Sequence, residues 1–105
     1  MDSIDLTKDF IISSIHNVGP RLVLLGVRSI GLFGSFARQE GRQQSDIDIL
    51  VEFEANKHNY DNFIETCFLL EELFGRKVEL VTKDSLSPYL EPYILKEVEY
   101  VSLSA

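Results

Sequence analysis

The sequence predicts an α/β fold: a short mixed sheet of about three strands packed against helices. Some segments repeat apolar residues at the spacing of amphipathic helices, whereas others alternate or run together as strands do. These two kinds of segment succeed one another along only 105 residues, a length that suits one compact domain and is too short for two. We therefore expect residues 1–105 to form a single domain.

The first two elements are expected to be helical. The segment "SIDLTKDFIISSIHNVG" stops at the helix-breaking pair Gly19-Pro20, and "RLVLLG" predicts a second short helical turn closed by Gly26. Four apolar residues lie at near-helical spacing in the first segment: Ile4, Ile11, Ile15 and Val18.

The middle of the chain predicts two strands. "VRSIGLFG" is expected to form the first, with Ile30 and Leu32 on one face, and "SFARQEG" to follow as one or two helical turns. After the polar turn "RQQS", the segment "DIDILVEFE" alternates and then becomes continuously apolar. That pattern is typical of a central strand covered on both faces.

The segment "YDNFIETCFLLEELFG" gives the clearest helix signal, with Asn59 as the N-cap and Gly75 as the end. "RKVELVT" predicts the third strand, and "SPYLEPYILKEVEYV" a last helix that starts near Pro92, because proline does not fit a helix interior. The apolar stripe of the clearest helix comprises Tyr60, Phe63, Ile64, Cys67, Phe68, Leu70, Leu73 and Phe74.

The composition excludes several classes of function. The net charge is −7, from 17 acidic and 10 basic residues, so the average field repels polyanions and no direct nucleic-acid binding is expected. No apolar run approaches the roughly 20 residues that span a membrane, and the acidic start lacks the basic region of a secretion signal. We expect a cytoplasmic protein without a membrane segment.

One motif indicates an anion site. Gly34 and Ser35 fall at the predicted strand-to-helix junction, where free backbone N–H groups favour phosphate and glycine permits its close approach. Arg38 lies one helical turn later, where it either reaches a phosphate or is simply solvated. With Arg28 and Arg42 it predicts a local basic patch, which suits a small anionic ligand.

A carboxylate pair follows ten residues later. Asp46 and Asp48 lie two apart on a strand, so their side chains point to the same face. At ~6 Å and an effective dielectric of ~20, the two charges repel by roughly 3 kcal/mol. No lysine or arginine lies within three residues to offset that repulsion. Glu79, on the third strand, is placed to add another carboxylate, and oxygen ligands of this kind favour Mg²⁺ shared with nucleotide phosphates.

Each feature also has an ordinary structural explanation. Gly-Ser is a common turn, the two aspartates suit an exposed edge strand, and Glu79 suits a solvated strand position. Their order and spacing together favour the nucleotide site.

The segment "GSFARQEGRQQSDIDILV" resembles the signature of nucleotidyltransferases of the DNA polymerase β type, in which Gly-Ser is followed ten residues later by Asp-x-Asp. The chain length and "GSFAR" are most similar to the minimal nucleotidyltransferase (MNT) family, from about Arg28 to Thr82. The resemblance implies a small nucleotidyltransferase fold for residues 1–105. It also implies transfer of a nucleoside monophosphate, usually AMP from ATP, to a hydroxyl.

The resemblance assigns roles to individual residues and indicates two departures. The implied nucleotide-binding residues are Gly34, Ser35, Arg38 and Ser45. The implied catalytic residues, which would also bind two Mg²⁺ ions, are Asp46, Asp48 and Glu79. Glu79 stands where the family commonly has aspartate, and Gln39 stands where it often has glycine.

The resemblance also implies a protein partner. Larger relatives carry an added domain that grips the acceptor, and this chain has no residues left to build one. The implied partner is a HEPN-domain toxin, neutralised in a hetero-oligomer by binding, by AMP transfer to a toxin tyrosine, or by both. Two alternatives are a non-catalytic module that occludes its partner through Tyr89, Leu90 and Tyr93, and a free-standing transferase acting on a small molecule such as an aminoglycoside.

Overall fold

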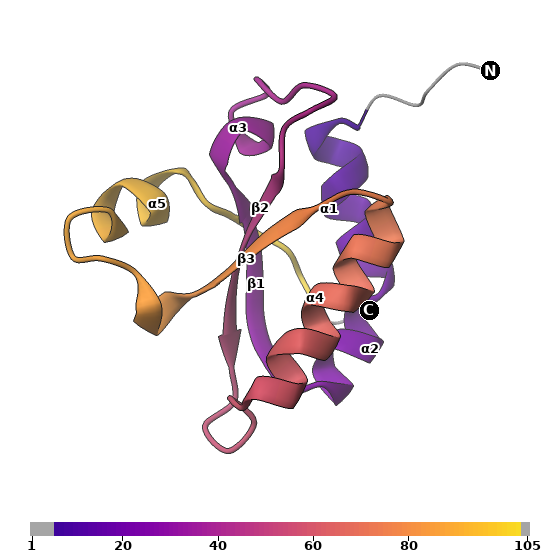
Figure 1. Ribbon diagram of the computed structural model, residues 1–105, viewed down its shortest axis with the longest axis vertical. Coiled ribbons are helices and arrows are strands. Elements are labelled where there is room, and N and C mark those ends of the chain that lie inside the picture. Colours follow the sequence, from indigo (N-terminus) through magenta and orange to yellow (C-terminus); the bar gives the residue numbers. More distant parts are fainter. Residues whose placement is uncertain (1–5, 104–105) are drawn as a thin grey trace.

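The computed structural model describes residues 6–103 and has four strands in the order β3-β2-β1-β4 (Figure 1). The strands are β1 (Val27–Phe33), β2 (Ile47–Phe53), β3 (Val78–Thr82) and β4 (Glu99–Tyr100). The helices are α1 (Lys8–Asn17), α2 (Gly19–Leu24), α3 (Gly34–Ala37), α4 (Tyr60–Phe74), the 3-10 turn η1 (Lys83–Ser85) and α5 (Glu91–Glu97).

The sheet is mixed, as predicted, and β2 lies at its centre. β1 pairs with β2 antiparallel, which places Phe33 opposite Asp48. β2 pairs with β3 in parallel, with α4 between them in the chain, and this register places Asp48 beside Glu79. The continuous apolar run of "ILV" therefore did indicate a central strand.

The fourth strand corrects the sequence prediction. The last helix starts at Glu91 next to Pro92, as expected, but it ends at Glu97 instead of continuing to residue 101. Glu99 and Tyr100 then pair antiparallel with Leu32 and Gly31 of β1. This pairing supplies hydrogen-bond partners to backbone groups at the edge of β1. If the helix had continued to residue 101, those groups would have lacked partners.

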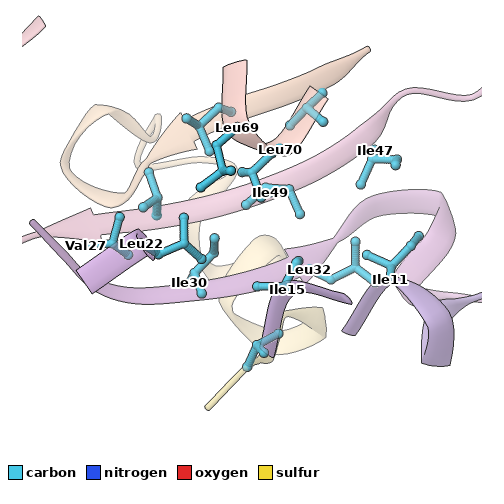
Figure 2. Packing of buried hydrophobic residues seen from close by; sticks show 14 of the residues in the cluster. Ile11, Ile15, Leu22, Val27, Ile30, Leu32, Ile47, Ile49, Leu69 and Leu70 are labelled. Carbon is cyan, nitrogen blue, oxygen red and sulfur yellow. The ribbon is translucent and has the colours of Figure 1, made fainter. Parts of the chain in front are cut away.

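One face of the sheet carries the core. α1, α2 and α4 lie together on this face, and apolar side chains from the strands and helices interlock between the layers (Figures 1 and 2). Ile11 and Ile15 of α1 are fully buried there, as predicted, whereas Ile4 lies outside the described residues. The core residues of β1 and β2 are Val27, Ile30, Leu32, Ile47, Ile49, Val51 and Phe53.

Helix α4 begins and ends where the sequence predicts, but its apolar stripe is narrower. The Asn59 side chain accepts a hydrogen bond from the Asn62 N–H, and the helix ends at Gly75. Tyr60 and Phe68 are 75% and 59% exposed, so the prediction that both belong to the core-facing stripe is wrong. The helix meets the sheet instead through a face that buries Thr66, Leu69 and Leu70.

The second face of the sheet is covered only in part, by α5, which lies on the side opposite α1, α2 and α4 (Figure 1). Gly31 of β1 makes this close approach possible, because a β-carbon there would lie 2.6 Å from Cγ2 of Val98. We call this surface the open face. None of the helices within residues 6–103 is long and apolar enough to cross a membrane.

Candidate active site

The site begins where β1 ends. Gly34 is buried, has a φ of +77° and opens the short helix α3, which confirms the predicted strand-to-helix junction. A β-carbon at this position would collide with the carboxylate of Asp48. Glycine is therefore required here both for the left-handed backbone and for the close approach of the acid.

The carboxylate of Asp48 lies on the open face. Its neighbours Ile47 and Ile49 are fully buried in the core, so Asp48 points the other way, against Gly34. Burial raises the pKa of Asp48 from 3.8 to about 6, and the charges of Glu79 and Asp46 add to the increase. The charges of Glu79 and Asp46 therefore both act on Asp48. Asp46 was predicted to lie on the strand with Asp48, but β2 begins only at Ile47.

Asp46, Asp48 and Glu79 do not form a complete metal-binding site by themselves. Within residues 6–103 no group of three or more His, Cys, Asp or Glu side chains is arranged to hold a metal ion by itself. Glu79 is exposed on β3, and Oδ2 of Asp46 lies 3.9 Å from Nζ of Lys77. This spread fits Mg²⁺, which keeps several waters and combines one or two carboxylates with substrate phosphates.

Lys77 supplies a positive charge close to the aspartates. The sequence near the aspartates contains no cation, but the parallel pairing of β2 with β3 brings this lysine to Asp46. The pair is exposed, so its net contribution to stability is small, about 0–1 kcal/mol. Asp48, the more buried aspartate, keeps its raised pKa despite the positive charge of Arg38 nearby.

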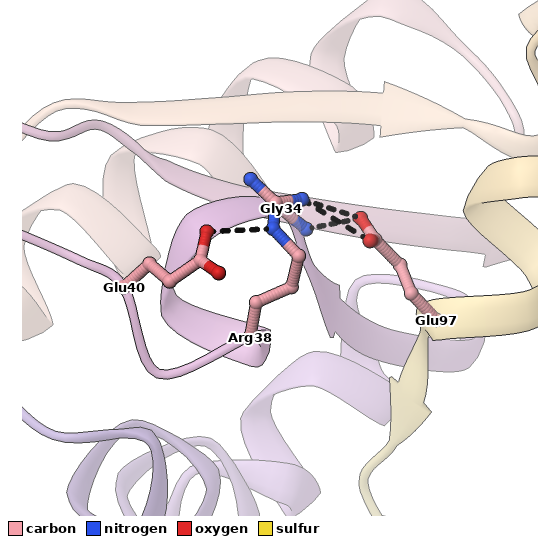
Figure 3. A network of polar contacts seen from close by, with 4 residues as sticks. All are labelled: Gly34, Arg38, Glu40 and Glu97. Carbon is pink, nitrogen blue, oxygen red and sulfur yellow. Dashed lines mark hydrogen bonds and ion pairs between the residues drawn. The ribbon is translucent and has the colours of Figure 1, made fainter.

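Arg38 is engaged by two acids. Its Nε lies 3.1 Å from Oε1 of Glu40, and its Nη1 lies 3.1 Å from Oε1 of Glu97 (Figure 3). The N–H of Gly34 donates to Oε2 of the same Glu97 at 2.8 Å. Arg38 and Gly34, both predicted to hold phosphate, thus hold one carboxylate of α5.

Glu97 is the residue that the sequence analysis missed. It is 63 positions from Gly34, and the segment around it was expected to continue as a helix. No local signal marks it, because its role depends on the turn from α5 into β4, which brings the end of the helix onto the open face.

The two serines differ in their surroundings. Ser35 is half-buried in α3, next to Gly34. Ser45 closes the turn before β2, where its hydroxyl accepts from the Arg42 N–H at 3.0 Å and its own N–H donates to the Arg42 carbonyl at 3.0 Å. The nucleotide-binding role of both serines remains a prediction.

The basic patch differs from the predicted one. Arg28 is exposed near the start of β1, at the end of the strand far from Gly34, so it does not belong to the site. Arg76 instead joins this region: its Nη1 donates to the Arg42 carbonyl at 3.0 Å, and its guanidinium lies 5.4 Å from the ring centroid of Phe36. Arg28 is close to the motif in the sequence, but the length of β1 separates it from Gly34.

Comparisons with known proteins identify the family. The family described as "Nucleotidyltransferase domain" matches residues 20–101. The protein adenylyltransferase MntA of Thermococcus cleftensis is 47% identical over 76 residues, which are 72% of this chain and 76% of that protein.

Solved structures show the same fold. A structure described as that of a minimal nucleotidyltransferase superposes with a TM-score of 0.80 at 28% identity, covering 92% of this chain and 98% of that one. A toxin–antitoxin complex with AMP-PNP superposes with a TM-score of 0.64 at 25% identity, covering 95% and 74%. The chain therefore belongs to the nucleotidyltransferase domain family, and it is a nucleotidyltransferase enzyme of the minimal kind.

Proposed function

We propose that this enzyme transfers AMP from Mg-ATP to a hydroxyl of a partner HEPN-domain toxin, a tyrosine being the expected acceptor, and so acts as an antitoxin in the cytoplasm. The observation that carries the proposal is the Asp48 carboxylate, which lies against Gly34 within electrostatic reach of Asp46 and Glu79. An adenylyltransferase relative and a toxin–antitoxin neighbour with AMP-PNP support the choice of nucleotide and partner.

In this proposal the phosphate-binding part of the site holds the triphosphate. The Gly34 N–H and the Arg38 guanidinium donate to its oxygens, with Ser35 and Ser45 completing the nucleotide site. Asp46, Asp48 and Glu79 would hold two Mg²⁺ ions. When bound, these ions neutralise charge on the triphosphate and lower the pKa of the attacking hydroxyl.

The reaction exchanges one phosphorus–oxygen bond for another. The acceptor oxygen forms a bond to the α-phosphorus, the bond from that phosphorus to the β-bridging oxygen breaks, and pyrophosphate leaves with the bonding electrons. In this proposal Glu79, which is exposed on β3 beside Asp48, takes the hydroxyl proton. The chain contributes chiefly by positioning the reacting groups.

Occlusion without transfer is the second candidate function. Tyr89, Leu90 and Tyr93, around the start of α5, are 85%, 56% and 73% exposed, which suits a contact surface for a partner. Glu79 in place of the family's aspartate favours this reading, because its longer side chain places the carboxylate differently.

Labelled ATP separates the two candidates. The enzyme is incubated with Mg²⁺, ATP labelled on the α-phosphate and a HEPN-domain toxin with which it forms a complex when the two are co-expressed. We expect label on the partner with wild type, and loss of more than about 99% of it with Asp48→Asn. Asp61→Asn, the same change at an exposed position of α4, should leave the label unchanged. Neutralisation of the toxin without any label would refute AMP transfer and favour occlusion.

A further inference from the structure

Glu97 occupies the two donors that the proposed function gives to the triphosphate. Its Oε2 accepts from the Gly34 N–H at 2.8 Å, and its Oε1 lies 3.1 Å from Nη1 of Arg38 (Figure 3). A second contact joins Nη1 of Arg38 to Oε2 at 3.4 Å. A carboxylate held by a backbone N–H and a guanidinium makes the kind of contact that phosphate oxygens make.

The backbone around Glu97 keeps the carboxylate in this position. Glu97 is the last residue of α5, and the next residues form β4, which pairs with β1 at Gly31 and Leu32. Gly31 admits Val98 close to the sheet, as described above. The Glu97 side chain is 28% exposed, so it is partly withdrawn from water in the site.

The charges near Glu97 act on it in opposite directions. Its negative charge acts on Asp48, together with the charges of Glu79 and Asp46. Glu97 is therefore attracted by Arg38 and repelled by Asp48 at the same time. A buried N–H at Gly34 nevertheless requires an acceptor whenever no ligand is present. A triphosphate that arrives with divalent cations can take over the same donors without that repulsion.

We propose that Glu97 is an internal competitor for the triphosphate. In the free enzyme its carboxylate satisfies Gly34 and Arg38, and an incoming triphosphate displaces it from both. This inference rests on the proposed function, which places the triphosphate at these donors. Glu97 thereby lowers the affinity of the site for phosphate anions and keeps its donors ordered until a ligand replaces it.

Inorganic tripolyphosphate tests the competition without any transfer chemistry. Its affinity is measured by calorimetry for wild type, Glu97→Gln and Glu97→Ala. We expect both variants to bind about tenfold more tightly, the equivalent of one charge-assisted contact that no longer has to be broken. Glu91→Gln removes the same charge at the other end of α5 and should bind as wild type does. Equal affinity in all four proteins would overturn the inference, as would weaker binding by the Glu97 variants, since Glu97 would then help to hold the ligand.

A measurement on the wild type covers the case in which the Glu97 variants fail to fold. Tripolyphosphate should shift the amide resonance of Gly34 and the carboxyl carbon resonance of Glu97 together, because one partner is exchanged for another. A shift at Gly34 with no change at Glu97, or no shift at either, would overturn the inference.

The proposed function can fail separately. Absence of AMP transfer with tighter tripolyphosphate binding by Glu97→Gln would remove the proposed reaction and support the competition. AMP transfer to the partner, with equal affinity of wild type and Glu97→Gln for tripolyphosphate, would support the proposed reaction and remove the competition.

Discussion

The two faces of the sheet differ in what they bury: one covers apolar side chains and the other carries carboxylates. Strand β2 contributes residues to both. Its residues Ile47, Ile49 and Val51 are fully buried under α1, α2 and α4, where apolar contact stabilises the fold. The residue between the first two, Asp48, is a half-buried carboxylate on the open face. One strand thus contributes alternate residues to the core and, from its opposite face, Asp48 to the candidate active site.

The open face keeps features that stability alone would not select. Burial and like charges raise the pKa of Asp48, whose carboxylate lies against the left-handed backbone of Gly34. Such arrangements persist only where the surrounding structure enforces them, and they cluster at functional sites. The contrast between the faces indicates that apolar burial on the helix-covered face offsets the unfavourable electrostatics of the open face.

The largest expected effect belongs to the helix-covered face. Ile49→Ala should lower the free energy of unfolding by about 3 kcal/mol, because it removes buried methyl groups and leaves a cavity. Glu52→Ala changes the same strand on the open face, where the carboxylate accepts one hydrogen bond from the Ser29 hydroxyl at 3.3 Å, and should lower it by less than about 1 kcal/mol. Urea denaturation measures both. Equal losses of unfolding free energy would contradict the conclusion that the helix-covered face supplies most of the stability.

The second effect arises where the faces meet, at Gly34. Gly34→Ala should lower the free energy of unfolding by about 3 kcal/mol or slightly less, because the new β-carbon strains a left-handed backbone and strikes the Asp48 carboxylate. Gly75→Ala shares the left-handed backbone, with a φ of +61°, but a β-carbon there has no neighbour within 4 Å. It should lower the free energy of unfolding by only about 1 kcal/mol. If thermal denaturation gives equal losses, Asp48 does not press against Gly34 as the structure indicates.

The helix-covered face was predictable because its signals are local. The apolar run of β2, the Asn59 cap and the Gly75 end each lie within a few residues, and each was confirmed. Tyr60 and Phe68 were assigned wrongly, since spacing alone does not say how wide a face of α4 the sheet covers. The Gly34 junction was predictable for the same reason, from its motif.

The rest of the open face was not predictable, because it is assembled from distant segments. Lys77 reaches Asp46 through the parallel register of β2 with β3. Glu97 reaches Gly34 only because α5 ends early and β4 pairs with β1. Neither register nor a two-residue edge strand leaves a pattern in the sequence that periodicity can detect.

The third effect is a pH dependence of stability that comes from Asp48. Its folded-state pKa of about 6 lies above the ordinary 3.8, so the folded state binds the proton more tightly than the unfolded chain. Stability from this group is therefore complete below about pH 4 and declines as the pH rises to about 6. Asp48→Asn, which cannot ionise, should be more stable than wild type by about 1 kcal/mol at neutral pH, with allowance for solvent screening of a half-exposed group.

Melting temperatures of wild type and Asp48→Asn across this pH range test the effect. The advantage of the variant should shrink as the pH falls and vanish below about pH 4, where Asp48 is protonated in both the folded and the unfolded wild type. Asp61→Asn, in the exposed first turn of α4, should bring no stability at neutral pH. An Asp48 variant that is less stable than wild type at neutral pH would mean that the open face is not electrostatically strained.

The smallest effect concerns Gln39, the position where the family often has glycine. Gln39 has a φ of +61°, and it is the one non-glycine residue with a positive φ within residues 6–103. Glycine would remove a strain of about 1–2 kcal/mol but would lose about 0.5–1 kcal/mol through the greater freedom of the unfolded chain. Gln39→Gly should therefore raise the free energy of unfolding by less than about 1 kcal/mol. Gln44→Gly, the same substitution in the loop that follows, has no such strain to remove and should lower it. The two substitutions share their chemistry and differ only in backbone conformation, and urea denaturation measures both. A gain in the free energy of unfolding for Gln39→Gly with a loss for Gln44→Gly would show that the backbone at Gln39 is strained. A loss for both would mean that contacts of the Gln39 side chain stabilise its left-handed turn.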